Sequence, residues 1–366
     1  MTIVSGPMDP KPRLAFVEDK TFSMMALAAA LEPAIAANHH TNFGPVSLAL
    51  ENRLSSLNGI GQTRATCCTS NGTVALHAVM TCFVNQIGKR LRWAVSDFGF
   101  MTNFIGPLTG HTLVECREDG FISIDNLRRL DPSSYDAVLA TNVFGLHENF
   151  DAVFDFCQIN GKALMIDNAA GFRALAPYHE NVAAYERLLW AETISLHHTK
   201  PWGMGEGGAV FLPASLLTTC RAAINFGVGD GQYLDQLDTC TNGKMSEMAA
   251  AQITLRVQDH ETWSPAYREQ AERIFELGRD AGLVPLIDSL PRRAVPGQIA
   301  FRSQRPVPLA EVQALPIPVL KYYRPGPTSN VIARRLYDHV VNVPSHGQMV
   351  DVPDRVLVAA LASLCG

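Results

Sequence analysis

The chain of 366 residues carries 30 lysines and arginines against 35 aspartates and glutamates, a formal net charge of −5. Nothing in this balance indicates a nucleic-acid partner, for which a basic surface is expected. With 47% hydrophobic residues, the chain can bury a core large enough for one large and one smaller domain. No apolar run approaches the ~20 residues of a membrane span, so no membrane partner is expected.

The cysteines and the first residues bear on the cellular compartment. Eight cysteines occur without C-x-x-C spacing, which predicts free thiols and neither disulfides nor a metal site. Residues 1–10 show no basic segment followed by an apolar core, so no signal peptide is expected. The sequence therefore predicts a cytoplasmic protein.

In chain order, the first informative segment is a small polar turn that opens an apolar-periodic helix. The turn holds Asn71, Gly72 and Thr73, and the helix is expected over residues 74–84. A helix N-terminus of this kind binds phosphate, because free N–H groups and the positive end of the dipole face the anion. Plain helix capping by the same residues is the alternative interpretation.

Short apolar runs at 93–96, 137–141, 164–167 and 209–212 alternate with helical patterns such as 150–157. This alternation predicts an α/β fold with a largely parallel sheet and helices on both faces. The third run places Asp167 at the carboxyl end of a buried strand, where open α/β sheets bind ligands. An Asp there can pair with the protonated ring nitrogen of pyridoxal phosphate (PLP), although a helix N-cap is an alternative role.

Lys200 follows a β-prone run and precedes a glycine-rich turn that ends at Gly208. A Schiff-base lysine needs this placement: an amine on a short loop beside a strand, with a lowered pKa, able to attack an aldehyde and later move protons. Taken alone, the same lysine could be a solvated loop charge. The three features occur along the chain in the order phosphate turn, strand-end aspartate and loop lysine, and together they indicate a PLP site more strongly than any one of them alone.

The remaining third of the chain predicts a long helix followed by a smaller domain. Residues 245–277 form one helical pattern, in which Pro265 is expected to break or kink the helix. Prolines become frequent from 285 to 327, as in the short strands and turns of a small C-terminal domain. We expect a large PLP-binding domain over 1–245 and a small domain over 246–366.

Several segments together resemble one known family: TNFGP at 41–45, NGTVAL at 71–76, NVFG at 142–145, NGKMSEMAA at 242–250, LKYYRP at 320–325 and VNVPSH at 341–346. The chain is similar to the DegT/DnrJ/EryC1/StrS aminotransferases, which mostly aminate keto groups on nucleotide-linked sugars. The resemblance implies the fold-type-I architecture: a mostly parallel seven-stranded sheet between helices, with a smaller C-terminal α+β domain. It also implies a homodimer with shared active sites.

The resemblance assigns roles to single residues. Lys200 would hold PLP and Asp167 would bind its ring nitrogen, and both would be catalytic. The other cofactor contacts implied are Gly72, Thr73, Phe100, Ala170, Ser195 and, from the neighbouring subunit, Asn242. Substrate contacts are expected from Asn42, Asn142, His198 and Lys244. Two positions depart from the family pattern: Ala170 stands where Gln or His is usual, and Asn142 replaces a His.

The implied reaction moves an amino group from glutamate or glutamine to the C3 or C4 keto group of a nucleotide-diphosphate sugar. One alternative is amination of a non-nucleotide ketone, such as a ketocyclitol or another natural-product intermediate. A sugar dehydratase of the same superfamily would carry His in place of Lys200, whereas His197 and His198 only precede it. A non-catalytic regulatory protein on this fold would have no need to keep both Lys200 and Asp167.

Overall fold

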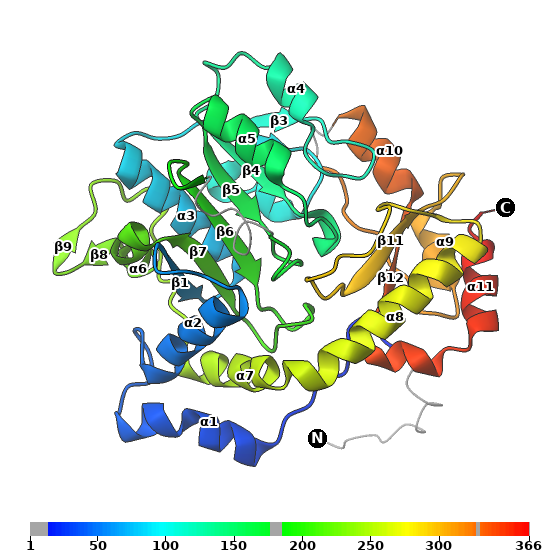
Figure 1. Ribbon diagram of the computed structural model, residues 1–366, viewed down its shortest axis with the longest axis horizontal. Helices are drawn as coiled ribbons and strands as arrows, with labels where there is room; N and C mark the ends of the chain where they lie inside the picture. Colours follow the sequence, from blue (N-terminus) through cyan, green and yellow to red (C-terminus); the bar gives the residue numbers. More distant parts are fainter. Residues whose placement is uncertain (1–13, 176–184, 327–329, 366) are drawn as a thin grey trace, which may run out of the picture.

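The computed structural model describes residues 14–175, 185–326 and 330–365, so the segment examined for a signal peptide lies outside the described residues. Its centre is a seven-stranded sheet in the order β1-β7-β6-β5-β4-β2-β3 (Figure 1). The strands are β1 (Arg64–Thr69), β2 (Trp93–Ser96), β3 (Thr112–Val114), β4 (Ala137–Thr141), β5 (Ala163–Asp167), β6 (Trp190–Ser195) and β7 (Gly208–Pro213). Only β7 runs antiparallel to its neighbours, which confirms the mostly parallel sheet.

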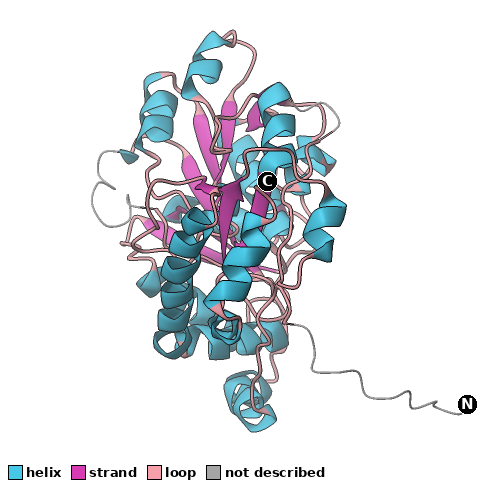
Figure 2. Cartoon of the chain, turned by 90° about the vertical axis from the view of Figure 1, so that its right-hand side faces the viewer, coloured by secondary structure: helices cyan, strands magenta, loops and turns pink. Residues whose placement is uncertain are grey.

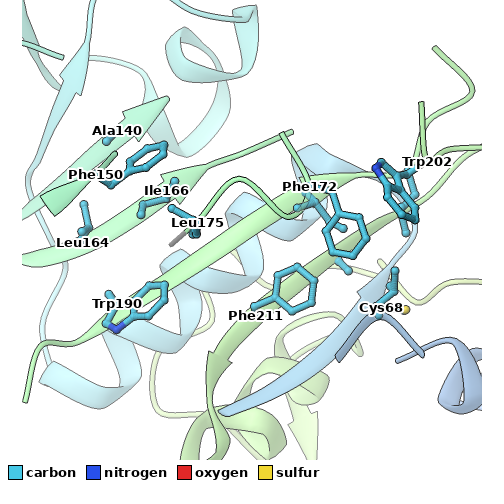
Figure 3. Packing of buried hydrophobic residues seen from close by; sticks show 14 of the residues in the cluster. Cys68, Ala140, Phe150, Leu164, Ile166, Phe172, Leu175, Trp190, Trp202 and Phe211 are labelled. Carbon is cyan, nitrogen blue, oxygen red and sulfur yellow. The ribbon is translucent and has the colours of Figure 1, made fainter. Parts of the chain in front are cut away.

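Both faces of the sheet are covered by helices, because the central strands are apolar on both sides. In β5, Leu164 and Ile166 face one buried cluster, while Ala163 and Met165 face the other. The second face is covered by α3 (Gly72–Ile87) and α6 (Leu217–Ala223). The first face is covered by α2 (Pro45–Leu57), α4 (Ile124–Arg129), α5 (Asp151–Ile159) and α7 (Glu247–Gln258), and α1 (Met24–Ala36) packs on α2 and α7. In the first cluster, Phe172 packs between Trp202 and Phe211 (Figure 3).

A second, smaller sheet lies at the other end of the molecule (Figure 1). It is antiparallel, in the order β10 (Val284–Pro285), β11 (Gln298–Arg302) and β12 (Val340–Pro344). Packed with it are α8 (His260–Asp280), α9 (Leu309–Ala314), α10 (Val331–His339) and α11 (Asp354–Ala362), which share a separate apolar core. Figure 2 views the molecule from this end, with helices surrounding the strands. The small C-terminal α+β domain is therefore present.

The sequence predicted a break or kink of the long helix at Pro265, but the structure places the break at another residue. The chain leaves the helix at Asp259, between α7 and α8, and Pro265 lies inside α8, which continues to Asp280. Side chains satisfy carbonyls at the end of α7: Trp263 Nε1 donates to Arg256 O at 2.8 Å. Burial of the later turns of α8 in the small-domain core outweighs the backbone bond that Pro265 cannot make.

The buried residues of α7 join the core of the large sheet, whereas most buried residues of α8 join that of the small sheet. The boundary between residues 245 and 246 stays a prediction. Within the described ranges, no helix is both long enough and apolar enough to cross a membrane. A two-stranded hairpin, β8 (Val228–Gly229) with β9 (Gln232–Tyr233), projects beside α6 (Figure 1).

Candidate active site

A cavity of about 720 Å³ lies at the carboxyl ends of β4, β5 and β6. Its wall also includes the start of α3, the loop between β6 and β7, parts of the small domain and residues 16–18. This is where open α/β sheets bind ligands. The cavity brings together seven of the residues assigned to the cofactor: Gly72, Thr73, Phe100, Asp167, Ala170, Ser195 and Lys200.

Asp167 is the last residue of β5 and is only 3% exposed. Its Oδ1 accepts a hydrogen bond from Ala169 N at 3.1 Å. Burial raises the pKa of this carboxyl to about 6, against the opposing effects of the Ala169 N–H and of the Lys200 charge. No helix begins in residues 168–175, so the capping alternative does not apply. A buried carboxylate with few donors favours a cationic partner, such as a protonated ring nitrogen.

Lys200 lies on a tightly closed loop between β6 and β7. Leu196 N donates to Gly207 O and His198 N donates to Gly205 O, both at 2.8 Å. Gly203 is required inside the loop, since a Cβ there would lie 2.0 Å from His197 O. Burial lowers the pKa of Lys200, with Asp167 opposing, so Lys200 belongs to the cavity wall and is not a solvated loop charge.

The start of α3 forms the third part of the cavity. Asn71 caps this helix by accepting a hydrogen bond from Val74 N at 2.9 Å, so the capping interpretation is correct. It does not exclude anion binding, because the other first-turn N–H groups have no partner within the helix. A Cβ at Gly72 would lie 3.2 Å from Ser195 Cβ, so glycine keeps the space beside the serine hydroxyl open.

These three features suit the three reactive parts of PLP. The N-terminus of α3 with Ser195 suits a phosphate, Lys200 an aldehyde and Asp167 a pyridinium nitrogen. The residues present therefore fit the cofactor. Among the described residues, no cluster of His, Cys, Asp and Glu could hold a metal ion.

The two departures from the family pattern lie in two turns that pack against each other. Asn142 Nδ2 donates to His147 O at 2.9 Å and to Asn168 Oδ1 at 2.8 Å, and Asn142 Oδ1 accepts from His147 N at 3.0 Å. The turn packs closely on Ala170, whose carbonyl oxygen would lie 2.3 Å from a Cβ at Gly145. Asn142 thus lines the cavity while its polar atoms hold the turn.

Other expected contacts lie outside the cavity of a single chain. Asn42, His198, Asn242 and Lys244 are not part of its wall, although His197 is. Asn242 is exposed, and its Oδ1 accepts from Lys244 Nζ at 2.8 Å. Lys244 Nζ also donates to Asn225 Oδ1 at 2.7 Å.

Sequence reasoning missed residues that reach the cavity from distant segments. Tyr323 stacks on Phe144, with ring centroids 5.3 Å apart, and burial together with the Asp167 charge raises the pKa of its hydroxyl. Gln298 enters from β11 of the small sheet, His346 from the chain that follows β12, and Glu18 from the N-terminal side. The segments 320–325 and 341–346, which contain Tyr323 and His346, resemble the family in sequence. No local pattern predicted that Gln298 or Glu18 would reach the cavity.

The sheet, the strand-end carboxylate and the loop lysine define a fold-type-I PLP-dependent protein. The model of the DegT/DnrJ/EryC1/StrS aminotransferase family, a family of PLP-dependent enzymes, matches residues 25–293, and the chain belongs to this family. The chain is 26% identical over 255 residues to protein Rv3402c of Mycobacterium tuberculosis. That match covers 66% of this chain and 59% of the relative, so the chain spans about 59% of the relative's length.

Solved structures show the same fold. DesI, crystallised in the presence of its TDP-sugar product, is 21% identical, and the match covers 98% of this chain and 93% of DesI with a TM-score of 0.76. The synthase of 3-amino-5-hydroxybenzoic acid (AHBA) is 17% identical, with 95% of this chain and 98% of that one covered and a TM-score of 0.73.

Proposed function

We propose that the protein is an aminotransferase that moves an amino group from glutamate or glutamine to the C3 or C4 keto group of a nucleotide-diphosphate sugar. The observation that carries this proposal is the meeting of Lys200 and Asp167 in one cavity, where each affects the pKa of the other. Because the chain keeps both Lys200 and Asp167, we favour catalysis over a regulatory role. A sugar dehydratase would carry His at the position of Lys200, so the lysine argues against that activity.

The described residues have distinct parts in this reaction. When bound, PLP supplies an aldehyde for imine formation and a cationic ring that stabilises negative charge on the adjacent carbon. Lys200 Nζ, with its pKa lowered by burial, would act as the nucleophile and would then carry the proton from the donor's α-carbon to C4′ of the cofactor. Asp167 keeps the ring nitrogen protonated. The start of α3 and Ser195 hold the phosphate.

The substrate would be recognised by hydrogen-bond acceptors in the small-domain wall of the cavity. Gln298 Oε1 and His346 Nδ1 have no hydrogen-bond partner among the described residues, and the two residues are 9% and 1% exposed. His346 Nε2 donates to Ala15 O at 3.0 Å, and burial lowers the pKa of the ring, so Nδ1 of the neutral imidazole is an acceptor. Two buried acceptors suit hydroxyl groups, as on a sugar ring. The sugar-nucleotide product of DesI supports this substrate class.

A second candidate substrate is a non-nucleotide ketone such as a ketocyclitol. The described residues of the cavity wall include no arginine, the side chain best suited to a diphosphate. Hydroxyl recognition by Gln298 and His346 would serve a cyclitol equally well. AHBA synthase, whose product is an aromatic amino acid, shares the fold. Amination assays with a panel of keto-sugar nucleotides and ketocyclitols, read by mass spectrometry, separate the two candidates.

We also propose a homodimer with shared active sites. Exposed apolar side chains occur in the hairpin segment of β8 and β9 and at the start of α7: Phe226 is 60% exposed, Tyr233 73% and Met248 49%. Such residues are suited to a subunit interface. Asn242, on the same surface region, would then reach the cofactor phosphate of the neighbouring subunit. We assign the enzyme to the cytoplasm, because its eight cysteines are free thiols.

Absorption spectroscopy tests the proposed chemistry. The purified protein should be yellow, with the visible band of a lysine-bound cofactor, and Lys200→Ala should abolish that band or convert it to the spectrum of free cofactor or of cofactor bound to an external amine. Lys162→Ala, a lysine outside the cavity, is the matched control and should keep the band. A colourless wild-type protein that takes up no added PLP would refute both the cofactor assignment and the proposed function.

A further inference from the structure

Lys20 makes contacts that the reaction outlined above does not use. Its Nζ donates to three backbone carbonyls of the loop that carries Lys200: His198 O at 2.7 Å, Lys200 O at 2.5 Å and Gly203 O at 2.8 Å. Burial lowers the pKa of Lys20 to about 7, an effect that Arg256 reinforces and Glu18 opposes. Because removing an ammonium group from water is costly, the three carbonyls must replace the lost water contacts.

The segment that carries Lys20, residues 14–20, is here called the N-terminal strap. It is tied to the helices on one side, where Glu18 Oε2 accepts from Arg256 Nη2 at 2.6 Å and from Tyr267 Oη at 3.1 Å. On the other side it is tied to the small domain, since Asp19 N donates to Gln348 Oε1 at 3.0 Å. Figure 1 shows the blue chain passing near α8 before it enters α1.

Arg256 binds the same loop, and the contacts of Lys20 and Arg256 with this loop are here called the clamp. Its Nε donates to Pro201 O at 2.8 Å, and its guanidinium lies 3.9 Å from the centre of the Trp263 ring. Two cations from separate elements therefore bind four carbonyls within residues 198–203, the turn that contains Lys200. Charge-assisted hydrogen bonds of this kind are stronger than neutral ones and fix geometry.

We propose that Lys20 is a positioning residue, whose ammonium group holds the turn at 198–203 so that the Lys200 amine keeps its place in the cavity. The expected effect of Lys20 on the reaction rate rests on the proposed function, whereas its expected effect on the rigidity of the turn does not. A displacement of about 1 Å of a reacting group costs about 100-fold in rate, so loss of the clamp should slow chemistry more than it weakens substrate binding.

Hydrogen–deuterium exchange tests the mechanical part without cofactor. Lys20→Met removes all three hydrogen bonds and Lys20→Gln retains an uncharged donor, so amide exchange in peptides covering 196–207 should rise in the order wild type, Gln, Met. Lys162→Met is the matched control, because Lys162 Nζ also binds two backbone carbonyls, Pro132 O and Tyr135 O, away from the cavity. This control should leave exchange at 196–207 unchanged.

The catalytic part is read on the PLP-loaded enzyme. In Lys20→Met, kcat should fall by about 10- to 100-fold with KM for the amino donor within about threefold of wild type, and the pH midpoint of the lysine-bound cofactor band should move. If amide exchange at 196–207 is equal in wild type, Lys20→Gln and Lys20→Met, then Lys20 does not hold the turn at 198–203, whatever the function of the protein. Raised exchange with unchanged kcat and spectrum would overturn the positioning role alone. A wild type without cofactor would refute the proposed function and leave the exchange result to decide on the clamp.

Discussion

At the scale of single residues, the proposed site rests on Lys200 and Asp167, two side chains whose burial shifts their pKa values. Lys200 loses part of its affinity for a proton, and Asp167 gains some, because neither has enough polar neighbours to replace water. Perturbed ionisation of this kind is typical of functional sites. In the cofactor-free chain the two charges partly compensate each other, and a pyridinium ion would give Asp167 a closer partner.

Asp167→Asn should change both stability and turnover. The folded cofactor-free protein keeps a proton on Asp167 up to about pH 6, whereas the unfolded chain releases it near its usual pKa of 3.8. The folded state therefore binds more protons in this window, and the contribution of Asp167 to the free energy of unfolding falls as the pH rises from about 4 to 6. A pKa displaced by this amount is worth about 3 kcal/mol.

Chemical denaturation of the cofactor-free wild type and of Asp167→Asn across this pH range measures the effect. The difference in unfolding free energy between the two proteins should change by about 3 kcal/mol, with the wild type losing its advantage above pH 6. In the holoenzyme, the same variant should slow transamination by orders of magnitude, since the ring nitrogen would no longer be held protonated. A variant with near-native turnover would show that Asp167 has only a structural role.

At the scale of elements, the site is built where the ends of β5, β6 and α3 meet. The sequence predicted β2, β4, β5 and β7, because strands buried on both faces read as short apolar runs. It also predicted the start of α3, where a polar turn precedes a periodic pattern. Strand-end placement of Asp167 and loop placement of Lys200 followed from these local signals.

Other elements could not be predicted from local patterns. Pro265 was expected to break or kink the long helix, yet α8 continues past it, because tertiary packing of α8 outweighs the lost backbone bond. The contacts of Lys20 with the turn at 198–203 join residues about 180 positions apart, and periodicity carries no information on such pairs. The same holds for Gln298, which reaches the cavity only because the small sheet packs beside it.

The close contact of β7 with the start of α3 gives a prediction at this scale. A Cβ at Gly208 would lie 2.6 Å from Asn71 O and 2.8 Å from Gly72 N, so Gly208→Ala must push the helix N-terminus away from its place. We expect a loss of about 1–3 kcal/mol in the free energy of unfolding and at least tenfold weaker PLP binding. Equilibrium dialysis and thermal unfolding measure these effects.

Gly61→Ala is the control for that experiment, because a Cβ at Gly61 meets nothing within 4 Å. This variant should bind PLP as the wild type does and should change stability by less than about 1 kcal/mol. Unchanged PLP affinity in Gly208→Ala would mean that the start of α3 does not hold the cofactor phosphate.

At the scale of the whole molecule, one chain encloses most of the candidate site but leaves Asn242 outside it. We propose that a second copy covers the surface that bears the exposed apolar residues of the hairpin segment and of the start of α7. In a dimer related by a twofold axis, the same surface of each chain would complete the other chain's cavity.

Mixing two inactive variants tests this arrangement. Lys200→Ala and Asn242→Asp should each be inactive, the second because a carboxylate repels the cofactor phosphate. After subunit exchange, one of the two sites in each heterodimer would contain both intact groups, so activity should return in the mixture. If exchange is confirmed by mass spectrometry and the mixture stays inactive, Asn242 does not belong to a shared site.

The central claim, amino transfer by Lys200 and Asp167, is tested most directly by following nitrogen from donor to product. Glutamate or glutamine labelled with heavy nitrogen at the transferred amine is incubated with the holoenzyme and a panel of keto-sugar nucleotides and ketocyclitols. Mass spectrometry should find the label in one aminated product with the wild type and in none with Lys200→Ala. Absence of labelled product from every acceptor, with the cofactor still bound to Lys200 after exposure to both donors, would contradict the account.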